Sequence, residues 1–493
     1  MEAHTREGQY TMDTQRIQSV HFIGVGGVGM SGIARVAFDQ GMRVSGSDLK
    51  ESRYTKQLKA AGIDVHIGHD PANLAGSGGA PDVVVVSTAI LDNNPELIAA
   101  KEQGLVIWHR AQMLAHLGSS LETLAVAGTH GKTTTSSMLA SVLDAMGEDP
   151  TFLIGGIVRS YGTNAHSGQG RHYVVEADES DKSFTYLSPA AVLVTNIEAD
   201  HLDHYRDLDE IYEKFGAFIG SVPADGGVVV ACGEDEALVE LARSTGRSVL
   251  TYGFGDDCDI RIASWEPCGV GSDFVLVLPG GREVSAHLKQ NPGRHNALNA
   301  AGVVGLVDAL GMDAAAAAAA LAEFGGVRRR FDLVGEAAGI TVVDDYAHHP
   351  TEIAATIEAA SKLGYRHVHV LFQPHRYSRA PLFTEVLHDE FGRAFDAADT
   401  VTFMDVYPAG EAPVPGVSGK TFLNVVLDHA GHPEAAYVPR RVEVVPYLAQ
   451  MAGAGDLVLT MGAGDVTAIG PQLIDALIAG EAGGAPVPAA PRR

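Results

Sequence analysis

A glycine-rich stretch, Gly128-Thr129-His130-Gly131-Lys132-Thr133-Thr134-Thr135, constrains this chain more than any other. It follows the apolar run 124–127, which predicts a buried strand, and it precedes residues 136–146, whose apolar side chains recur at helical spacing. A strand, a glycine-rich turn and a helix in this order are typical of a phosphate-binding site, because the turn amides and the helix N-terminus offer N–H donors. Lys132 would reach the outer phosphates of a nucleotide, and the Thr133 hydroxyl would hold Mg²⁺.

The stretch departs from the usual G-x-x-x-x-G-K-[ST] pattern, because Val126 stands where the first glycine is expected. An ordinary glycine-rich connection in an α/β domain would have a similar local sequence. The stretch alone therefore leaves both interpretations open.

Length and charge narrow the class of protein. A chain of 493 residues predicts about three domains. The formal net charge of −26 argues against nucleic acid as a partner, because phosphate backbones require clustered Lys and Arg. Three cysteines without C-x-x-C spacing indicate a reducing compartment and no thiolate metal site. No stretch is apolar enough to enter a membrane, and the polar N-terminus lacks a signal-peptide core, so we expect a cytoplasmic protein. The oligomeric state is not fixed by the sequence.

The first predicted domain, residues 17–118, is Rossmann-like and follows a flexible leader, 1–16. A strand candidate at 19–25 leads into Gly24-Val25-Gly26-Gly27-Val28-Gly29, and Asp48 ends the next strand, where a ribose-binding acid would lie. This fingerprint alone predicts NAD, but its amides would serve any diphosphate, including that of a UDP-sugar. Ser87 follows a third strand candidate, 82–87, at the edge where ligands bind.

The second predicted domain, residues 119–330, contains the phosphate loop. Glu176 directly follows a strand candidate, 172–175, and suits a Mg²⁺ ligand. His201 follows the next strand, 191–195, and by residue type alone is better explained as a hydrogen-bonding loop histidine, because Mg²⁺ prefers oxygen. The helix expected up to Ala309 opens with polar side chains that either flank a planar base or cap the helix, namely His295, Asn296 and Asn299.

The third predicted domain, residues 331–480, is again α/β, and a Gly/Ala/Pro-rich tail, 481–493, is expected to be flexible. Charged residues follow two of its strand candidates, as Asp344–Glu352 and His375–Arg379. The carboxyl ends of strands form the functional edge of an open sheet. The sequence therefore predicts a second site at this edge, next to the basic run 328–330.

Taken together, these motifs resemble the Mur ligase family over nearly the whole chain, residues 21–477. The motifs that carry the resemblance stand in the family's order: Gly24–Met30, Gly128–Thr135, Glu176–Asp181, Asn196–Tyr205, His295–Asn299, Arg328–Phe331, Asp344–Glu352 and His375–Arg379. Each is weak alone, but eight in register are very specific. The family also has a shorter phosphate loop, G-T-x-G-K-T, which accounts for Val126.

The resemblance implies a three-domain α/β fold with a UDP-binding domain, a central ATPase domain and an amino-acid-binding domain. It implies an ATP-dependent ligase of peptidoglycan synthesis, and thus of cell-wall growth and division. The lactyl carboxylate of UDP-N-acetylmuramate attacks the γ-phosphate of ATP, and the amine of L-alanine then attacks the acyl phosphate. Sister ligases hold a second metal with a carbamylated lysine, and the matching position here is Gly216, with Lys214 two residues early.

The resemblance also assigns site residues. The catalytic group would be Lys132, His201, His348 and Arg379. ATP would contact Gly128, Thr129, His130, Gly131, Lys132, Thr133, Thr134, His295, Asn296, Asn299, Arg330 and Asp345. The UDP-sugar would contact Gly24, Gly26, Gly27, Gly29, Asp48 and Ser87, together with Thr163 and Asn164 in a loop at 162–164. The amino acid would contact Tyr346, His348, Arg376 and Arg379. Thr133 and Glu176 would hold Mg²⁺, and His201 would hold a second metal, Mg²⁺ or Mn²⁺.

Three alternatives stay open. A related ligase that attaches a ready-made murein peptide during wall recycling shares most motifs. An NAD-linked dehydrogenase with a fused ATPase would fit the first fingerprint, and a non-catalytic ATP-driven switch would need the strand-end arginines to be structural.

Overall fold

The structure, a computed structural model, describes residues 17–76, 78–180, 182–200 and 204–483. The chain divides into two compact units. One runs to Leu117 and includes Ala165–Ser167, and the other comprises Gly118–Asn164 and the chain from Gly168 onwards. None of the helices within these described ranges combines the length and apolar character needed to cross a bilayer.

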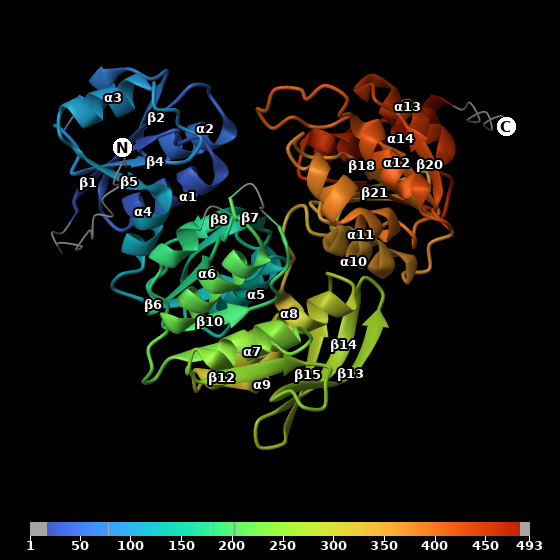
Figure 1. Ribbon diagram of the computed structural model, residues 1–493, viewed down its shortest axis with the longest axis horizontal. Helices are drawn as coiled ribbons and strands as arrows, with labels where there is room; N and C mark the ends of the chain where they lie inside the picture. Colours follow the sequence, from blue (N-terminus) through green and yellow to red (C-terminus); the bar gives the residue numbers. More distant parts are fainter. Residues whose placement is uncertain (1–16, 77, 181, 201–203, 484–493) are drawn as a thin grey trace, which may run out of the picture. The chain divides into compact units, whose positions relative to one another are not determined.

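The first unit is built on a parallel five-stranded sheet of order β3-β2-β1-β4-β5. This is the strand order of one half of a dinucleotide-binding fold, in which the order reverses between β1 and β4. Its strands, blue in Figure 1, are β1 Ser19–Ile23, β2 Arg43–Asp48, β3 Asp64–Ile67, β4 Val83–Val86 and β5 Val106–His109. Its α-helices are α1 Val28–Asp39, α2 Arg53–Ala60, α3 Pro95–Glu102 and α4 Arg110–Leu117.

The second unit begins with a ten-stranded sheet of order β15-β14-β13-β12-β11-β10-β6-β9-β7-β8. The strands are β6 Glu122–Ala127, β7 Thr151–Val158, β8 Thr163–His166, β9 His172–Glu176, β10 Ala191–Val194, β11 Val228–Cys232, β12 Val249–Gly253, β13 Ile260–Cys268, β14 Gly271–Leu278 and β15 Arg282–Leu288. The helices are α5 Lys132–Ala145, α6 Leu208–Gly220, α7 Glu236–Ser244, α8 Arg294–Ala309 and α9 Ala314–Ala320. Strand β6 lies between β9 and β10 and is parallel to both. The segments that follow these three strands therefore meet at one edge.

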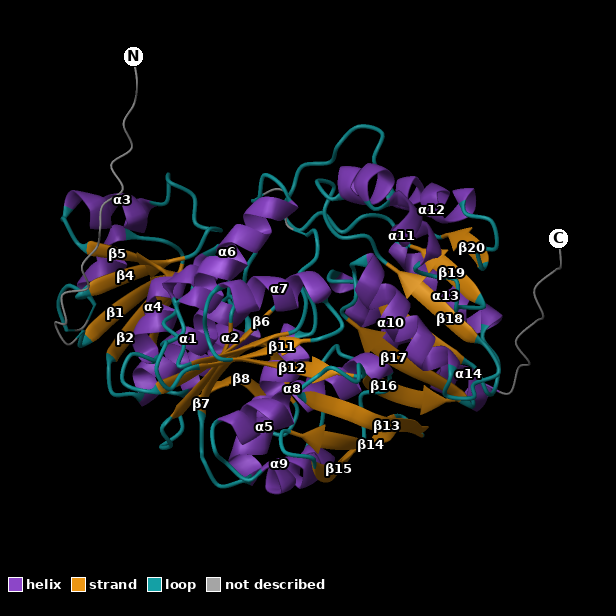
Figure 2. Ribbon diagram, turned by 60° about the horizontal axis from the view of Figure 1, so that its bottom comes forward, coloured by secondary structure: helices purple, strands orange, loops and turns teal. Residues whose placement is uncertain are grey.

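The same unit contains a six-stranded sheet of order β16-β17-β21-β18-β19-β20 with helices on both faces (Figures 1 and 2). Its strands are β16 Asp332–Ala337, β17 Ile340–Asp345, β18 Val368–Phe372, β19 Thr400–Phe403, β20 Glu434–Tyr437 and β21 Leu457–Met461. Its helices are α10 Pro350–Ser361, α11 His388–Arg393, α12 Gly419–Asp428, α13 Arg441–Met451 and α14 Ile469–Gly483. Strand β21 separates β17 from β18, and all three are parallel.

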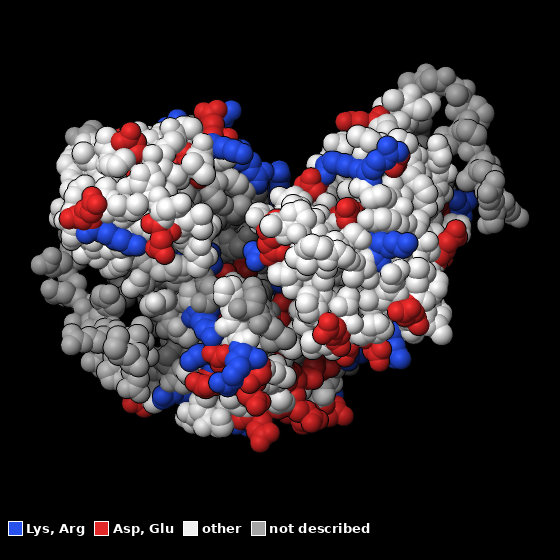
Figure 3. Space-filling view, turned by 45° about the horizontal axis from the view of Figure 1, so that its top comes forward, with Lys and Arg blue, Asp and Glu red and all other residues white. Residues whose placement is uncertain are grey.

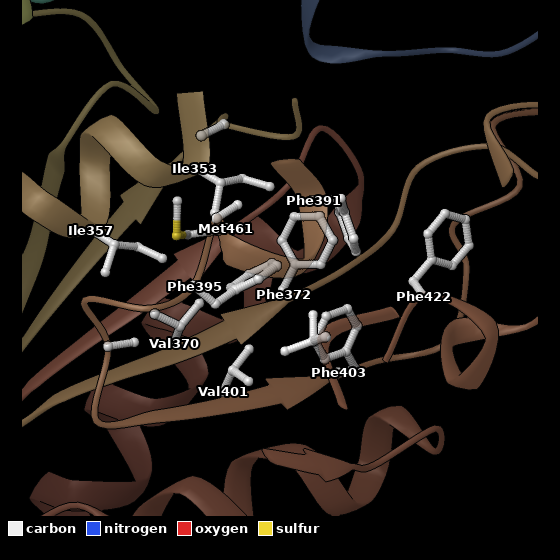
Figure 4. Packing of buried hydrophobic residues seen from close by; sticks show 14 of the residues in the cluster. Ile353, Ile357, Val370, Phe372, Phe391, Phe395, Val401, Phe403, Phe422 and Met461 are labelled. Carbon is white, nitrogen blue, oxygen red and sulfur yellow. The ribbon is translucent and has the colours of Figure 1, made fainter. Parts of the chain in front are cut away.

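A cluster of phenylalanines stabilises one face of this sheet (Figure 4). The Phe372 ring lies 5.3 Å from Phe395 and 5.4 Å from Phe403 between ring centroids. Ile353 and Ile357 from α10 pack against the same core and are fully buried. A separate core on the other face contains Leu448 from α13 and Leu473 from α14. Helix α10 is thereby fixed on the sheet, and its N-terminus is held next to the end of β17.

The three-domain α/β architecture agrees with the prediction, but some local predictions were wrong. The helix after the phosphate loop was expected from residue 136 and begins at Lys132, because Gly131 closes the turn with φ of +82°. The prediction of a loop at 162–164 was wrong. Thr163 and Asn164 lie in strand β8, where the backbone is extended and pairs with the neighbouring strand β7. Helix α14 continues to Gly483, past the expected end of the third domain at 480.

Candidate active site

The turn between β6 and α5 has a backbone that only glycine adopts easily. Gly128 has φ of +136°, and a Cβ there would lie 2.0 Å from Thr195 Oγ1. Gly131 is the N-cap residue of α5. The amides of Thr129 and His130 donate to the backbone oxygen and the Oδ1 of Asn196, at 3.0 and 2.8 Å. These bonds to the segment after β10 fix the turn, and the first amides of α5 have no partner within the helix.

The Lys132 ammonium lies inside the turn. Its Nζ donates to the carbonyl oxygens of Gly128 and Thr129, at 2.6 and 2.9 Å, and to the carboxylate of Glu179. Burial alone would lower the pKa of Lys132, but the carboxylates of Glu179, Asp178 and Glu176 outweigh it and raise the pKa. Lys132 is thus a permanent cation at the point where a phosphate would bind.

Thr133 and Glu176 form an oxygen pair beside this cation. Thr133 Oγ1 donates to Glu176 Oε1 at 2.9 Å, and the amide of Gly155 donates to Glu176 Oε2 at 2.6 Å. Burial raises the pKa of Glu176, against the effects of the Lys132 charge and of these two bonds. A hydroxyl and a carboxylate at this spacing are donors that Mg²⁺ prefers. His201, the predicted third metal ligand, lies outside the described residues.

A pocket opens next to the turn, and most of the predicted base-binding side chains line it. It is lined by His130, Gly131, Thr134, Asn196, Asn291, Pro292, His295, Asn296, Asn299, Arg330, Phe331, Asp345, Thr351, Glu352, Ala355 and Thr356. The N-cap residue of α8 is Gly293, which has no side chain to cap the helix. Asn296 Nδ2 donates to Pro292 O at 2.9 Å, and Asn299 Nδ2 donates to Asn296 Oδ1 at 3.4 Å.

Arg330, which precedes β16, and Asp345, the last residue of β17, also line the pocket. Asp345 accepts hydrogen bonds from the amides of Phe331 and Ala347, at 2.7 and 2.8 Å, and burial raises its pKa to about 6. The Arg330 guanidinium lies 3.5 Å from Glu352 Oε1. Burial lowers the pKa of His295 to about 4, so its ring is neutral near pH 7. The pocket therefore offers the Arg330 cation, two carboxyl groups and several amides to a polar planar ligand.

Three of the four side chains predicted to bind an amino acid lie near one another. His348 Nδ1 is 3.1 Å from Tyr346 O and 3.2 Å from Glu352 Oε2. Burial and the nearby charge of Arg379 lower the pKa of His348. Arg379 donates from Nη2 to Asp200 Oδ1 at 3.2 Å, while its Nη1 is buried with no hydrogen-bond partner among the described residues. Arg376 differs from this group, because it is exposed.

Sequence reasoning missed several residues of this edge. Asp200 pairs with Arg379, Glu179 pairs with Lys132, and Glu198, His349 and Glu352 surround His130. All five lie inside the sequence motifs that carry the family resemblance, so their positions could have been noted as candidates. Their pairing could not be predicted, because the sequence does not say which strand ends meet. Gly216, which the family resemblance aligns with a lysine of sister ligases, lies in α6, and a Cβ there would lie 3.1 Å from Leu241 Cδ1.

The first unit holds its own glycine turn. Gly24 has φ of +83°, and the amide of Gly26 donates to Asp48 Oδ2 at 2.8 Å. The other Asp48 oxygen accepts from the amide of Lys50 at 3.2 Å, so the predicted ribose-binding acid also braces the turn. Gly27 is the N-cap of α1, and Gly29 lies within the helix. Ser87 directly follows β4, the strand that pairs with β1.

The basic side chains of the candidate site are each paired with a carboxylate. Figure 3 shows Lys and Arg scattered among Asp and Glu on the face in view, without one continuous basic patch. The cations that line the candidate site are the buried or half-buried Lys132, Arg330 and Arg379, each next to a carboxylate. This pattern suits small anionic ligands held one phosphate or carboxylate at a time.

Comparison with known proteins identifies the same three parts. Three family models match: "Mur ligase family, catalytic domain" over residues 19–120, "Mur ligase middle domain" over 126–307, and "Mur ligase, glutamate ligase domain" over 329–464. A UDP-N-acetylmuramate–L-alanine ligase of Thermobifida fusca is 45% identical over 479 residues, covering 94% of this chain and 98% of that protein.

Solved structures agree with this result. The crystal structure of a UDP-N-acetylmuramate-alanine ligase from Thermotoga maritima matches with a TM-score of 0.76 and 30% identity, covering 94% of this chain and 99% of that one. A murein peptide ligase from Psychrobacter arcticus matches with a TM-score of 0.67 at 24% identity, covering 93% and 98%. The second match shows a shared fold.

Proposed function

This chain belongs to the Mur ligase family, and from that premise we propose that it joins L-alanine to the carboxylate of UDP-N-acetylmuramate at the expense of ATP. ADP and phosphate are the other products, and the reaction supplies peptidoglycan precursors. The observation that carries the proposal is the meeting of three strand ends at one edge: Lys132 after β6, Glu176 at the end of β9 and Asp200 after β10, with Arg379 reaching Asp200 from the third sheet.

Each part of the chain has a separate role in this proposal. Residues 17–118 bind the UDP-sugar through Gly24, Gly26, Gly27, Gly29, Asp48 and Ser87. Residues 119–330 bind ATP, and Thr163 and Asn164 are assigned to the sugar by family resemblance alone. Residues 331–480 bind the amino acid. The adenine pocket is the one lined by His295, Asn296, Asn299, Arg330 and Asp345.

Lys132 is proposed to act on the transferring phosphoryl group. Its ammonium is desolvated and held by Glu179, so a γ-phosphate that enters the turn would meet a charge already in place. The phosphoryl group moves to the lactyl carboxylate and leaves ADP in the loop. The amides at the start of α5 hold the phosphates through the same step.

Thr133 and Glu176 are the residues that would hold Mg²⁺, because they are adjacent oxygen donors in a buried setting. When bound, Mg²⁺ neutralises charge on the phosphates. By family resemblance, His201 is assigned to a second metal.

Arg379 and His348 are proposed to bind L-alanine. The buried Nη1 of Arg379 would donate to the carboxylate of the amino acid. His348 is neutral because its pKa is lowered. Its Nδ1–H faces the acceptors Tyr346 O and Glu352, so Nε2 carries the lone pair that would accept a proton from the attacking amine. Tyr346 is assigned to the same site.

The experiment that tests the proposal is phosphate release from ATP across an amino-acid panel. Release should require both UDP-N-acetylmuramate and L-alanine, and omission of either substrate should abolish it. Unchanged release without one of them would contradict the proposal. A competition between L-alanine and a murein tripeptide separates the recycling alternative, which would prefer the peptide.

A further inference from the structure

Four side chains next to the phosphate turn form a compact group to which the proposed reaction assigns no metal ion. His130 and Glu198 come from the segments after β6 and β10, and His349 and Glu352 come from the start of α10. Ligand atoms of His130, Glu198 and His349 lie within 4.8 Å of one another. The two imidazole rings are tilted by 37° with centroids 4.5 Å apart.

We propose that His130, Glu198 and His349 form a binding site for a transition-metal dication of the zinc class. His130 Nε2 lies 3.5 Å from Glu198 Oε2, and His349 Nδ1 lies 4.0 Å from the same oxygen. Metal–ligand bonds of about 2.0–2.1 Å in a tetrahedral site place neighbouring ligand atoms about 3.4 Å apart. The group therefore needs only a small inward shift to enclose an ion.

A second observation points to a ligand at this position. His349 is 2% exposed and faces the Glu352 amide in a capping-box arrangement at the start of α10, but neither of its ring nitrogens makes a hydrogen bond of regular geometry to a described residue. His130 Nε2 is likewise buried without a hydrogen-bond partner. A buried polar group is normally satisfied, so an imidazole aimed at a second imidazole and a carboxylate is poorly explained by packing alone. A metal ion would satisfy all three groups at once.

The surroundings of the group resemble the outer shell of a metal site. Glu352 Oε1 lies 3.5 Å from His130 Nδ1, on the side of the ring away from Glu198. A carboxylate there orients a metal-binding histidine and fixes its tautomer. Thr351 Oγ1 donates to Glu198 Oε2 at 2.6 Å, the oxygen that faces both imidazoles, and so holds that oxygen in place while one of its lone pairs stays available to an ion. His130 thus has a partner on its outer side, and Glu198 is oriented through the oxygen that would bind the ion.

The donor set also separates this site from the Mg²⁺ pair. Thr133 and Glu176 offer oxygen, which suits Mg²⁺, whereas two imidazole nitrogens and one carboxylate suit Zn²⁺, Co²⁺ or Ni²⁺.

A second histidine cluster makes a useful contrast. His367, His369 and Asp456 also lie close together, but Arg366 donates twice to Asp456 and both histidines hydrogen-bond to it. That cluster is satisfied without an ion.

The metal site is tested by direct binding of an ion. A negative result is therefore distinct from a failure of the ligase proposal. Metal-free full-length protein is titrated with Co²⁺ in millimolar Mg²⁺, which occupies the oxygen sites, and visible absorption is recorded. We expect one Co²⁺ per chain with the intense bands of a four-coordinate ion, displaced by Zn²⁺. His349→Ala and Glu198→Gln should each weaken binding at least about tenfold, and His367→Ala should bind as the wild type does.

Circular dichroism and the thermal midpoint check that each variant is folded. If His349→Ala does not fold, Glu198→Gln decides, because Glu198 is partly exposed and its amide keeps the shape of the side chain. Absence of Co²⁺ bands in the wild type, or unchanged binding in the folded variants, would overturn the site. His130 would then be a protonated imidazole held between the carboxylates of Glu198 and Glu352.

Discussion

Two glycine turns in this chain have the same strand–turn–helix arrangement but carry different side chains. Each follows a buried parallel strand and opens a helix, β1 to α1 in the first unit and β6 to α5 in the second. In the first, Asp48 from the neighbouring strand accepts the Gly26 amide, and residues 24–29 contain no titratable side chain. In the second, the turn itself carries His130 and Lys132, and Glu176 and Glu179 lie beside it.

The difference shows where chemistry comes from in such folds. Backbone amides and helix N-termini are common to both turns and suffice to hold an anion. A charge that can act on a transferring phosphoryl group must come from side chains, and only the second turn has one, Lys132, whose position is set by the ends of neighbouring strands. On the proposed function, the first turn would therefore bind its ligand, and the second would also take part in catalysis.

The largest expected effect is the loss of that charge. Lys132→Ala should lower phosphate release by about 10³-fold, because it removes the buried positive charge next to which the transferring group would bind. Lys289→Ala is the matched control, since Lys289 is an exposed residue paired with Glu323. Steady-state phosphate release with all three substrates measures both. Near-normal turnover in Lys132→Ala would remove the distinction between the two turns.

In the metal-free protein, titration of His130 separates the two turns next, because only the second turn contains a titratable histidine. Burial would lower the pKa of His130, but Glu198 and Glu352 outweigh it and raise the pKa to about 9. A raised histidine pKa stabilises the fold fully below the unfolded value of about 6.5, and this stabilisation is lost as the pH rises through 9. The free-energy advantage of the wild type over His130→Gln should shrink by up to about 3 kcal/mol between pH 6.5 and 9.5.

Urea midpoints of both proteins across that window measure this effect. The window also avoids His349, whose pKa is lowered to about 4 by burial and by the nearby His130, so that its titration lies on the acid side. A difference between wild type and variant that stays constant with pH would mean that His130 is not held by the two carboxylates.

The contrast between the turns also shows how far the sequence could predict this site. Lys132, Thr133 and Glu176 were predictable, because each stands at the end of an apolar run and parallel strands share an edge. The partners Glu198 and Glu352 of His130 were not, because they lie in the sequence 68 and 222 residues away from it and meet only once two sheets are packed. The same holds for Arg379 and Asp200, which lie on different sheets.

The second turn differs from the first in a further respect, because its neighbourhood is completed by side chains from another sheet. Arg379→Ala should lower kcat/KM for L-alanine by about 10–150-fold, equivalent to about 1.5–3 kcal/mol for a charged hydrogen bond. Arg376→Ala is the matched control and should change the same quantity only a few-fold, because Arg376 is exposed. KM for ATP should stay unchanged in both. Equal losses in the two variants would contradict the assignment of Arg379 to the amino acid.

The smallest expected effect concerns the hydrogen bond by which Asp48 holds the first turn. A Cβ at Gly26 would lie 2.8 Å from Asp48 Oδ2, whereas a Cβ at Gly27 meets nothing closer than Gly24 O at 3.9 Å. Gly27 has φ of −73°, which alanine adopts without strain. Gly27→Ala should leave stability equal or higher, because alanine restricts the unfolded chain. Gly26→Ala should cost about 1 kcal/mol, because the Asp48 carboxylate must move away from the amide it accepts.

Thermal midpoints of the ligand-free protein compare the two glycine variants without involving substrate contacts. Asp48→Asn adds a second check, since an amide keeps the shape of the side chain but weakens the bond from the Gly26 amide. If Gly26→Ala and Gly27→Ala are equally stable, Asp48 does not brace the turn and is free to meet the ligand. The first turn would then also depend on a strand-end side chain, and the two turns would differ only in the sign of the charge they present.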